Sequence, residues 1–244
     1  DKQILKIEKK EISRLITYND KLEKLKVLSD KQFQAYRDIK TSFINKDVCL
    51  LHGVTSSGKT EIYIKLIQDQ LDKGKQVLYL LPEIALTTQI INRLKIYFGD
   101  KVGISHSRMN NNERVEIWNA VKEKNSKKTQ YPIIIGARSS VFLPFDNLGL
   151  IIVDEEHEPS FKQHQPSPRY HARDASIFLA HLHTAKVLLG SATPSLESYY
   201  NTQIDKYALV ELNSRFDDIQ LPEIHTVDIR KAHLKNKMQY HFSP

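Results

Sequence analysis

The chain contains very little cysteine and no long apolar run, and each lack excludes a class of protein. The only cysteine, Cys49, rules out an intramolecular disulfide and a zinc cluster built from cysteines, and fits a reducing compartment. No apolar run approaches the ~18 residues of a membrane-spanning helix. Residues 1–10 are charged and lead into no apolar stretch, which excludes a signal peptide. We therefore expect a soluble, cytoplasmic protein with no membrane partner.

Histidine is abundant, with 10 in the chain, but its spacing does not predict a metal site. His181 and His183 are two residues apart, which points their rings away from each other on a helix. We expect no metal bound by histidine.

Positive charge exceeds negative charge by 7, and the sequence pI is near 9.2. This balance favours a polyanionic partner, although a basic surface that serves only solubility remains an alternative. Hydrophobic residues make up 40% and charged residues 27%. A chain of 244 residues with this composition can build one sizeable core with appendages.

The pattern along the chain divides it into three regions. Residues 1–27 are rich in Lys and Glu with apolar residues at helical spacing, and we expect a helical connector from an upstream domain. Residues 28–214 carry the alternating strand and helix signals. Residues 215–244 lose this pattern and are interpreted as a linker. A start without methionine and an end at Ser243-Pro244 are expected of a piece of a longer protein.

The stretch GVTSSGKT follows the apolar run Val48–Leu51 and predicts a phosphate-binding loop between a buried strand and a helix. Backbone N–H groups of such a loop face an anion. Lys59 is expected to reach the β- and γ-phosphates of a nucleotide, and the Thr60 hydroxyl to bind Mg²⁺. The residues expected to hold the nucleotide are Gly53, Thr55, Ser56, Ser57, Gly58, Lys59 and Thr60.

Gln32, upstream of this loop, has two interpretations. Ser29 is a good N-cap and Gln32 falls at the third helical position, which predicts a capping box. The Gln32 amide also offers a donor and an acceptor that fit an adenine edge. The residues alone leave both open.

Further apolar runs predict strands at 77–81, 102–105, 131–136, 148–153 and 187–189. Amphipathic patterns predict helices from the phosphate loop to Gly74, around 90–98, at 110–124 and at 172–183. Strands this uniformly apolar are covered on both faces. The predicted fold class is α/β, with a central, mostly parallel sheet flanked by helices on both faces.

Asp154 and Glu155 follow the run 148–153, which we expect to lie next to the phosphate-loop strand. Ligands gather at the carboxyl ends of parallel strands. Asp154 would hold Mg²⁺ there, and Glu155 would act as a base or position the attacking water. Spacing alone gives Glu156 no role.

The turn Ser191-Ala192-Thr193 follows the last predicted strand. Its hydroxyl groups either hydrogen-bond His157 or a metal-bound water, or merely belong to a tight turn between Gly190 and Pro194. Both interpretations remain open.

Together these motifs resemble the superfamily-2 helicases, and most closely the primosomal replication-restart DNA helicases. The resemblance rests on LSDKQ, GVTSSGKTEIY, LLPEIALTTQ, SHSRMNNNER with Trp118, GARSSVFLPF, IIVDEEHEPSFKQ, RYHARD and LLGSATPSLES. It implies a RecA-like P-loop lobe, the first of two motor lobes, in an ATP-dependent helicase that moves 3′→5′ and restarts stalled or collapsed forks. It also implies a bacterial, nucleoid-associated protein that binds forked and single-stranded DNA and works with single-strand-binding and primosome proteins.

The resemblance also assigns roles around ATP. Gln32 would contact adenine, Asp154 and Glu155 would be metal ligand and catalytic carboxylate, and His157 would sense the γ-phosphate and signal to DNA. The zinc region of such helicases and the transition-state arginine of their second lobe are not in this chain. We therefore expect ATP binding with very slow hydrolysis.

For DNA, the resemblance implies contacts along several motifs, at Pro82, Glu83, Thr87, Gln89, His106, Ser107, Arg138 and Ser139. An aromatic-rich loop would run from Phe161 to Arg173, where Phe161 and Tyr170 offer stacking faces beside Lys162 and Arg173. Residues 164–168 depart from the pattern, because relatives often carry a Gly-aromatic pair there. A surface loop with incidental aromatics remains an alternative.

Two other functions stay open. The chain would also suit a duplex-DNA translocase with the same motor lobe, or a nucleotide-gated module that binds DNA or protein without catalysis.

Overall fold

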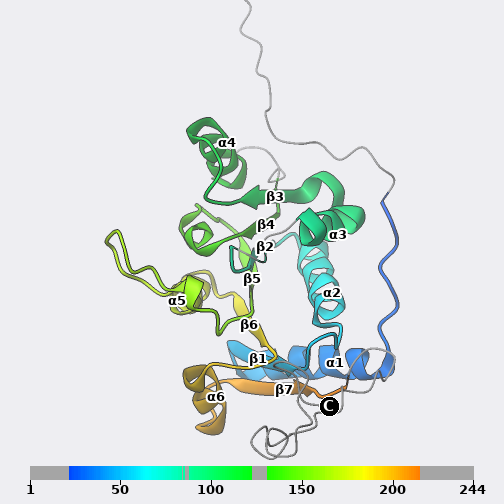
Figure 1. Cartoon of the computed structure of the whole chain (residues 1–244). Helices are drawn as coiled ribbons and strands as arrows, with labels where there is room; N and C mark the ends of the chain where they lie inside the picture. The colour runs from blue at the N-terminus through cyan, green and yellow to red at the C-terminus, as the bar shows by residue number, and fades with distance from the viewer. Residues whose placement is uncertain (1–21, 84, 86–87, 123–130, 215–244) are drawn as a thin grey trace, which may run out of the picture.

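The computed structural model describes residues 22–83, 85, 88–122 and 131–214 (Figure 1). Its strands are β1 (Val48–Gly53), β2 (Gln76–Leu80), β3 (Val102–Ser105), β4 (Ile133–Gly136), β5 (Leu148–Asp154), β6 (Lys186–Ser191) and β7 (Ala208–Leu212). Its α-helices are α1 (Asp30–Asn45), α2 (Lys59–Asp72), α3 (Thr88–Phe98), α4 (Asn111–Lys122), α5 (Ala172–His183) and α6 (Leu196–Gln203). Three short 3-10 helices are η1 (Gly99–Lys101), η2 (Arg138–Phe142) and η3 (Pro159–Phe161).

The described strands form one sheet in the order β3-β4-β2-β5-β6-β1-β7. Every pairing in it is parallel. Alternate residues of a strand point to opposite faces, so Cys49 and Leu51 enter one core cluster while Val48 and Leu50 enter the other. Helices cover both faces, with α1, α2 and α3 on one side and α4, α5 and α6 on the other (Figure 1). The predicted parallel α/β fold is confirmed, and so is the reason for its uniformly apolar strands.

Local signals at the helix ends also match the prediction. Ser29 caps α1, and Gln32 completes the capping box from the third helical position. Gly74 follows α2 with φ +67°, the left-handed conformation that glycine adopts without a Cβ penalty. Ser29 therefore fixes the start of α1, and Gly74 fixes the end of α2.

Residues 1–27 were predicted to be helical, and this prediction is wrong for residues 22–27, which the structure describes. Residues 22–28 form no helix, while residues 1–21 lie outside the described part. The Glu23 N–H donates to the Ile96 carbonyl at 3.0 Å, and Leu25 and Leu28 pack on the core. Tertiary contacts to α3 therefore override the helical spacing. Residues 215–244 also lie outside the described part, so the linker stays a prediction.

The sequence interpretation placed no element after residue 194, whereas the structure has α6 and β7 there. β7 pairs with β1 at the edge of the sheet, with Leu50 opposite Leu209. Both elements are short, and α6 has no broad apolar face, so the periodic signal is weak. Among the described residues, no helix is long and apolar enough to cross a membrane.

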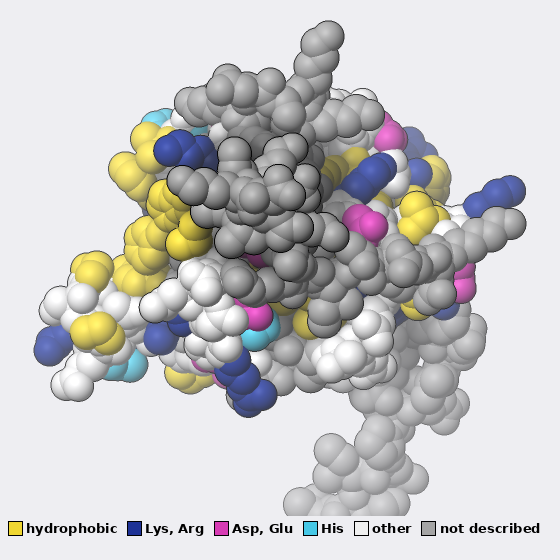
Figure 2. Space-filling view, turned by 90° about the horizontal axis from the view of Figure 1, so that it is seen from above, with side chains coloured by type: hydrophobic (Ala, Val, Ile, Leu, Met, Phe, Trp, Pro, Cys, Tyr) yellow, Lys and Arg dark blue, Asp and Glu magenta, His cyan; other side chains and the backbone are white. Residues whose placement is uncertain are grey.

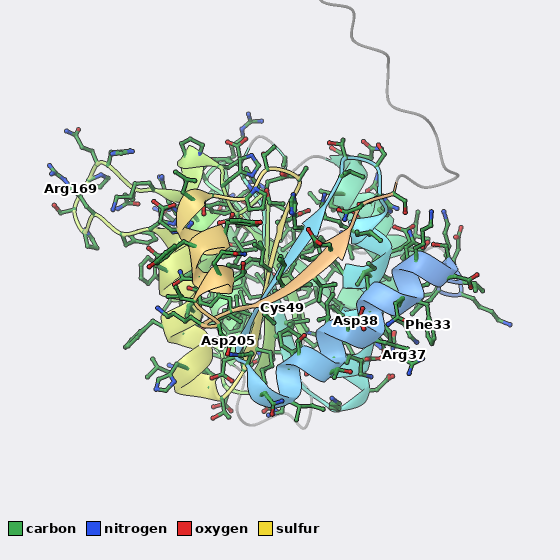
Figure 3. The ribbon with its side chains drawn as sticks, turned by 90° about the horizontal axis from the view of Figure 1, so that it is seen from below. Phe33, Arg37, Asp38, Cys49, Arg169 and Asp205 are labelled. Atoms are coloured by element: carbon green, nitrogen blue, oxygen red, sulfur yellow. The ribbon has the colours of Figure 1, made fainter. Side chains whose placement is uncertain are left out.

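Cys49 tests the placement of β1 in the core. Its side chain is 0% exposed, and burial raises the pKa of its thiol to about 12 (Figure 3). Because the thiolate is the reactive form, we expect a disulfide reagent at pH 8 to modify the folded protein at least ~100-fold more slowly than the urea-unfolded protein. Absorbance of the released thiolate measures both rates. Equal rates would show that β1 is accessible.

Candidate nucleotide site and adjoining groove

The phosphate loop joins β1 to α2, as its sequence predicts. Gly58 is the N-cap of α2, at φ +83°, and contributes no side-chain cap. The first N–H groups of α2 therefore lack intrahelical partners and suit an anion. A Cβ on Gly58 would lie 2.0 Å from Gln32 Nε2, so the loop needs glycine both for its conformation and for space.

The loop opens into a pocket of about 540 Å³. All the predicted nucleotide ligands from Thr55 to Thr60 line it, together with Gln32, Asp154 and Glu155. Lys59 Nζ donates to the Gly53 carbonyl at 2.7 Å, and the buried Ser57 hydroxyl is an unpartnered polar group. A glycine cradle, a lysine and an unpartnered buried hydroxyl fit a triphosphate.

Four residues of this pocket were not assigned a role from the sequence. They are Lys26 and Val27, from the strap of residues 22–28 before α1, Glu61 of α2 and Arg93 of α3. Arg93 forms an ion pair with Glu61, which lies in the first turn of α2. Lys26, Val27 and Arg93 lie outside the sequence motifs. The packing of the strap against α3 brings these residues to the nucleotide loop.

Gln32 joins helix α1 to the phosphate loop. Its Oε1 accepts from the Ser29 N–H at 3.0 Å, and its Nε2 donates to the Ser57 carbonyl at 3.4 Å. The side chain is 2% exposed. The capping box is thus confirmed, and the same side chain lines the nucleotide pocket.

Asp154 ends β5, but β6 lies between β5 and β1, so the predicted neighbouring position is wrong. The Cα of Asp154 pairs with that of Gly190 in β6. A Cβ on Gly190 would lie 1.8 Å from Tyr63 Oη and 3.2 Å from Asp154 Oδ1. Because Gly190 has no side chain, Asp154 and Tyr63 meet across β6. Asp154 therefore contacts α2 although its strand is not next to β1.

Two tyrosines hold the Asp154 carboxylate. Tyr63 Oη donates to Oδ1 at 3.0 Å, and Tyr79 Oη donates to Oδ2 at 3.1 Å. Burial and the neighbouring Glu155 raise the pKa of Asp154, while hydrogen bonds from the tyrosines and the charge of Lys59 oppose the shift. Burial and Asp154 raise the pKa of both tyrosines well above the usual range. No sequence motif indicates this arrangement, because the three residues lie on the separate elements α2, β2 and β5.

The partly buried charge of Asp154 predicts a stability effect. The folded-state pKa is raised, so the group opposes folding at pH values above it, where the carboxylate is charged. We expect Asp154→Asn to raise the free energy of unfolding at pH 7 by about 0.5–2 kcal/mol, as measured by urea denaturation. Asp72→Asn, on the exposed end of α2, is the control and should change little. A less stable Asp154→Asn protein would contradict the inferred cost of burial.

Glu155 lies beside Asp154 at the pocket and has φ 49°. A left-handed backbone is uncommon outside glycine and is often kept at functional sites. Its N–H donates to Asp154 Oδ1 at 3.2 Å, and its own side chain is 38% exposed. The backbone therefore separates the two carboxylates into a partly buried one held by the tyrosines and a more accessible one.

His157 connects the carboxyl end of β5 to β6. Its Nδ1 lies 2.8 Å from Ser191 Oγ, its Nε2 lies 3.4 Å from Thr193 Oγ1, and its Nδ1 lies 3.7 Å from Glu155 Oε2. Of the two interpretations of the Ser-Ala-Thr turn, the hydrogen bonds to His157 are confirmed. The ring thus bridges the accessible carboxylate and the next strand end.

Glu156 has a structural role that spacing did not indicate. It is 0% exposed and accepts from Arg173 at 3.0 Å, from the Ser195 N–H at 2.7 Å and from Ser198 Oγ at 2.8 Å. Arg173 is itself 8% exposed, so its predicted DNA contact is corrected. Its guanidinium binds a buried carboxylate and ties α5 to the start of α6.

Mg²⁺ fits the donor set of the pocket. Thr60 and Asp154 both line it, and Mg²⁺ in nucleotide sites typically takes one or two protein oxygens plus phosphates and water. Within the described ranges, no group of three or more His, Cys, Asp or Glu residues is placed to hold a metal ion. The residues present therefore fit Mg²⁺ brought with a nucleotide.

A second hollow, of about 630 Å³, lies at the carboxyl ends of β3 and β4, and we call it the groove. It gathers most of the residues predicted to contact DNA from three motifs that are distant in sequence, namely Pro82, Glu83, His106, Ser107, Arg138 and Ser139. Gln89 is exposed on α3 and does not line it, and Thr87 lies outside the described residues.

The loop of residues 162–171 projects from the body beside the groove, with Arg169 at its outer end (Figure 3). A bridge between Lys162 and His171 closes its base, where Tyr170 also lies. Arg138 Nη1 donates to the carbonyls of Ser160 and Lys162 at 3.1 and 2.9 Å. Arg138 therefore anchors this loop, a role the sequence did not suggest.

Phe161 does not offer a stacking face. It is 0% exposed and belongs to the core cluster beneath the groove, which corrects its prediction. Tyr170 is half-buried and packs edge-on against Phe142, with ring centroids 4.8 Å apart. The exposed aromatics at the groove are instead Phe142 and Trp118, which sequence reasoning had not assigned to DNA contact.

The fold and this composite pocket define a helicase-type nucleotide-binding lobe. The family model for DEAD/DEAH box helicases matches residues 29–202, and the chain belongs to that family. Among curated proteins, Replication restart protein PriA of Bacillus subtilis (strain 168) is 44% identical over 218 residues, which cover 88% of this chain and 26% of that protein. PriA of Rickettsia felis is 46% identical over 207 residues, covering 85% of this chain and 31% of that protein. The chain thus resembles the first motor lobe of PriA and spans about a quarter to a third of such relatives.

Solved structures agree on the fold. RecG bound to a three-way DNA junction matches with a TM-score of 0.54 at 22% identity, over 77% of this chain and 24% of that one. The DUF1998 helicase MrfA bound to DNA also has a TM-score of 0.54, at 16% identity, over 77% of this chain and 27% of that one. At these identities the likeness concerns the fold alone, that of a RecA-like helicase lobe.

Proposed function

We propose that the chain is the ATP-binding first motor lobe of an ATP-dependent DNA helicase that moves 3′→5′ and restarts replication at stalled or collapsed forks. The observation that carries the proposal is the composite pocket, in which the phosphate loop and Asp154-Glu155 meet although they are far apart in the sequence. The similarity to PriA, whose printed name is replication restart protein, supports the choice among helicases.

In this proposal each residue of the pocket has one task. Lys59 binds the β- and γ-phosphates, while Thr60 and Asp154 hold Mg²⁺, which when bound neutralises charge on the phosphates. Glu155, the accessible carboxylate, takes the proton of the attacking water or orients that water. The amide of Gln32 contacts adenine, supported by its place beside the loop.

His157 is proposed to report the state of the γ-phosphate. Its ring lies between Glu155 and the Ser191 hydroxyl, so a change at the carboxylate alters the hydrogen bond to β6. Glu156, next in sequence, is held by Arg173 at the start of α5, which directly follows the projecting loop. This route joins the nucleotide pocket to the loop beside the groove.

DNA is the proposed partner at the groove. The chain carries a net charge of +7, and RecG and MrfA, which share the fold, were solved bound to DNA. Contacts to phosphate fix a strand without reading sequence, which suits an enzyme that acts on any fork. Single-strand-binding and primosome proteins at the nucleoid are the partners that this role implies, in the bacterial cytoplasm.

A duplex-DNA translocase is the second candidate. A type ISP restriction-modification enzyme, LlaBIII, bound to DNA has a TM-score of 0.51 at 21% identity over 72% of this chain and 13% of that one. Stimulation of ATP hydrolysis by duplex rather than forked DNA would favour it. A binding module without catalysis is the third candidate, and it predicts that loss of Glu155 leaves cellular function intact.

The deciding experiment is a DNA-stimulated ATPase assay on the full-length protein with and without Glu155→Gln. Forked DNA should stimulate the wild-type protein, and Glu155→Gln should lose at least ~100-fold in turnover while it still binds Mg-ATP. The present chain alone should bind Mg-ATP and hydrolyse it very slowly, because an arginine from a second lobe accelerates such reactions by ~10³–10⁵. Full turnover in Glu155→Gln would refute the assigned role.

A further inference from the structure

Two exposed aromatic side chains face the groove from different elements. Trp118 of α4 is 43% exposed, and Phe142, the last residue of η2, is 54% exposed. The floor between them is apolar, with Leu81, Ile117 and Phe161 among its residues. Large aromatics left exposed at a hollow are typical of binding sites.

Two arginines and one carboxylate line the groove beside this apolar floor. Arg114 and Arg138 both line the groove, and its carboxylate, Glu83, accepts a hydrogen bond from Ser107. The face seen from above shows hydrophobic side chains gathered on the left, with Lys and Arg among them (Figure 2). The occupant is therefore expected to combine flat apolar groups with negative charge. This combination favours nucleic acid over an acidic or a neutral peptide.

The two arginines are partly committed to the protein itself. Arg114 donates to the carbonyls of Met109 and Ser107 at 3.1 and 2.9 Å, and Arg138 donates to the loop carbonyls described above. Guanidinium groups held in this way stiffen the walls and supply a positive field, but offer fewer free N–H groups for bidentate phosphate binding. The groove is thus better equipped for bases than for phosphates.

We propose that the groove takes the bases of single-stranded DNA, which stack on Trp118 and Phe142 while phosphates lie at the positive rim. The inference rests on the proposed function and replaces Phe161 as the expected stacking residue. Stacking needs no particular base, because every base has a π-face. Phe142 is held edge-on by Tyr170 at the base of the projecting loop, and this loop leads directly into α5, where Arg173 binds Glu156.

Trp118 provides the readout, because the chain contains 1 tryptophan. Tryptophan fluorescence is titrated with an oligothymidylate and with an abasic oligonucleotide of equal length and charge. The expected result is quenching by the oligothymidylate, with binding at least ~10-fold tighter than that of the abasic strand. Equal affinity for both strands, or binding without quenching, would overturn the inference.

Two variants show whether the groove aromatic Phe142, unlike an exposed aromatic elsewhere on the surface, contributes to oligonucleotide binding. Phe142→Ala should weaken oligothymidylate binding on the order of 10-fold and leave abasic binding unchanged. Phe178→Ala is the matched control, since Phe178 is 65% exposed on α5 and does not line the groove, and it should change neither. Equal losses in the two variants would refute a specific role for Phe142.

The outcomes also distinguish the groove from the motor proposal. If the protein binds Mg-ATP but no oligonucleotide, the groove inference falls while the nucleotide site stands. If apolar peptides quench Trp118 and oligothymidylate does not, the groove belongs to a protein partner and the inference is likewise overturned. Failure to bind Mg-ATP would count against the proposed function, whatever the oligonucleotides do.

Discussion

Lys59→Ala is expected to weaken Mg-ATP binding at least ~100-fold, because charge-assisted hydrogen bonds to phosphate are among the strongest single contacts in a nucleotide site. Lys59 begins α2 and lines the pocket, and its Nζ lies 2.7 Å from the Gly53 carbonyl within the loop. Thermal unfolding with and without ligand measures the effect. At a concentration 100 times the dissociation constant, ATP should stabilise the wild-type protein by about 2.7 kcal/mol and the variant hardly at all.

Lys73→Ala is the matched control for that experiment. Lys73 caps the opposite end of α2, is exposed and does not line the pocket. Its stabilisation by ATP should equal that of the wild-type protein. Equal stabilisation of Lys59→Ala would mean that the nucleotide does not occupy the phosphate loop.

Arg173→Ala is expected to cost roughly 3–5 kcal/mol of unfolding free energy, because it leaves a buried carboxylate without its counter-ion. The carboxylate is that of Glu156, which is 0% exposed. Asp174→Ala removes the other acidic partner of the same guanidinium, whose side chain is 63% exposed, and should cost about 0–1 kcal/mol. Urea denaturation of the three proteins measures both differences.

A double variant shows whether the loss comes from the unpaired charge. Arg173→Met combined with Glu156→Gln removes both charges, and we expect it to be more stable than Arg173→Ala alone. A double variant at least as unstable as the single one would indicate that Arg173 acts through packing and not through its charge.

The predictable part of the fold and site was what short stretches of sequence encode. The phosphate loop is a local strand-loop-helix unit, so its glycines and Lys59 predicted where a pocket would lie. The strands were recognisable because both faces of a parallel sheet are buried. Asp154 and Glu155 were recognisable because they follow an apolar strand. Ligands gather at the carboxyl ends of such strands in a parallel sheet.

The residues that sequence reasoning missed or misplaced depend on partners far along the chain. Tyr63 and Tyr79 looked like ordinary core residues, and only the side-chain-free Gly190 lets Tyr63 meet Asp154 across β6. Arg173 looked like a DNA contact because positive charge near a loop is ambiguous until its buried partner is known. Phe161 looked like a stacking residue for the same reason, since an aromatic residue beside a loop fits a core and a surface equally well.

The most direct measurement is a calorimetric titration of this chain with ATP in the presence of Mg²⁺ and again in EDTA. A nucleotide pocket in which Thr60 and Asp154 hold the metal predicts saturable binding of one ATP per chain, at least ~10-fold tighter with Mg²⁺. Asp154→Asn should bind equally in both buffers. Absence of saturable binding, or the same Mg²⁺ enhancement in Asp154→Asn, would contradict it.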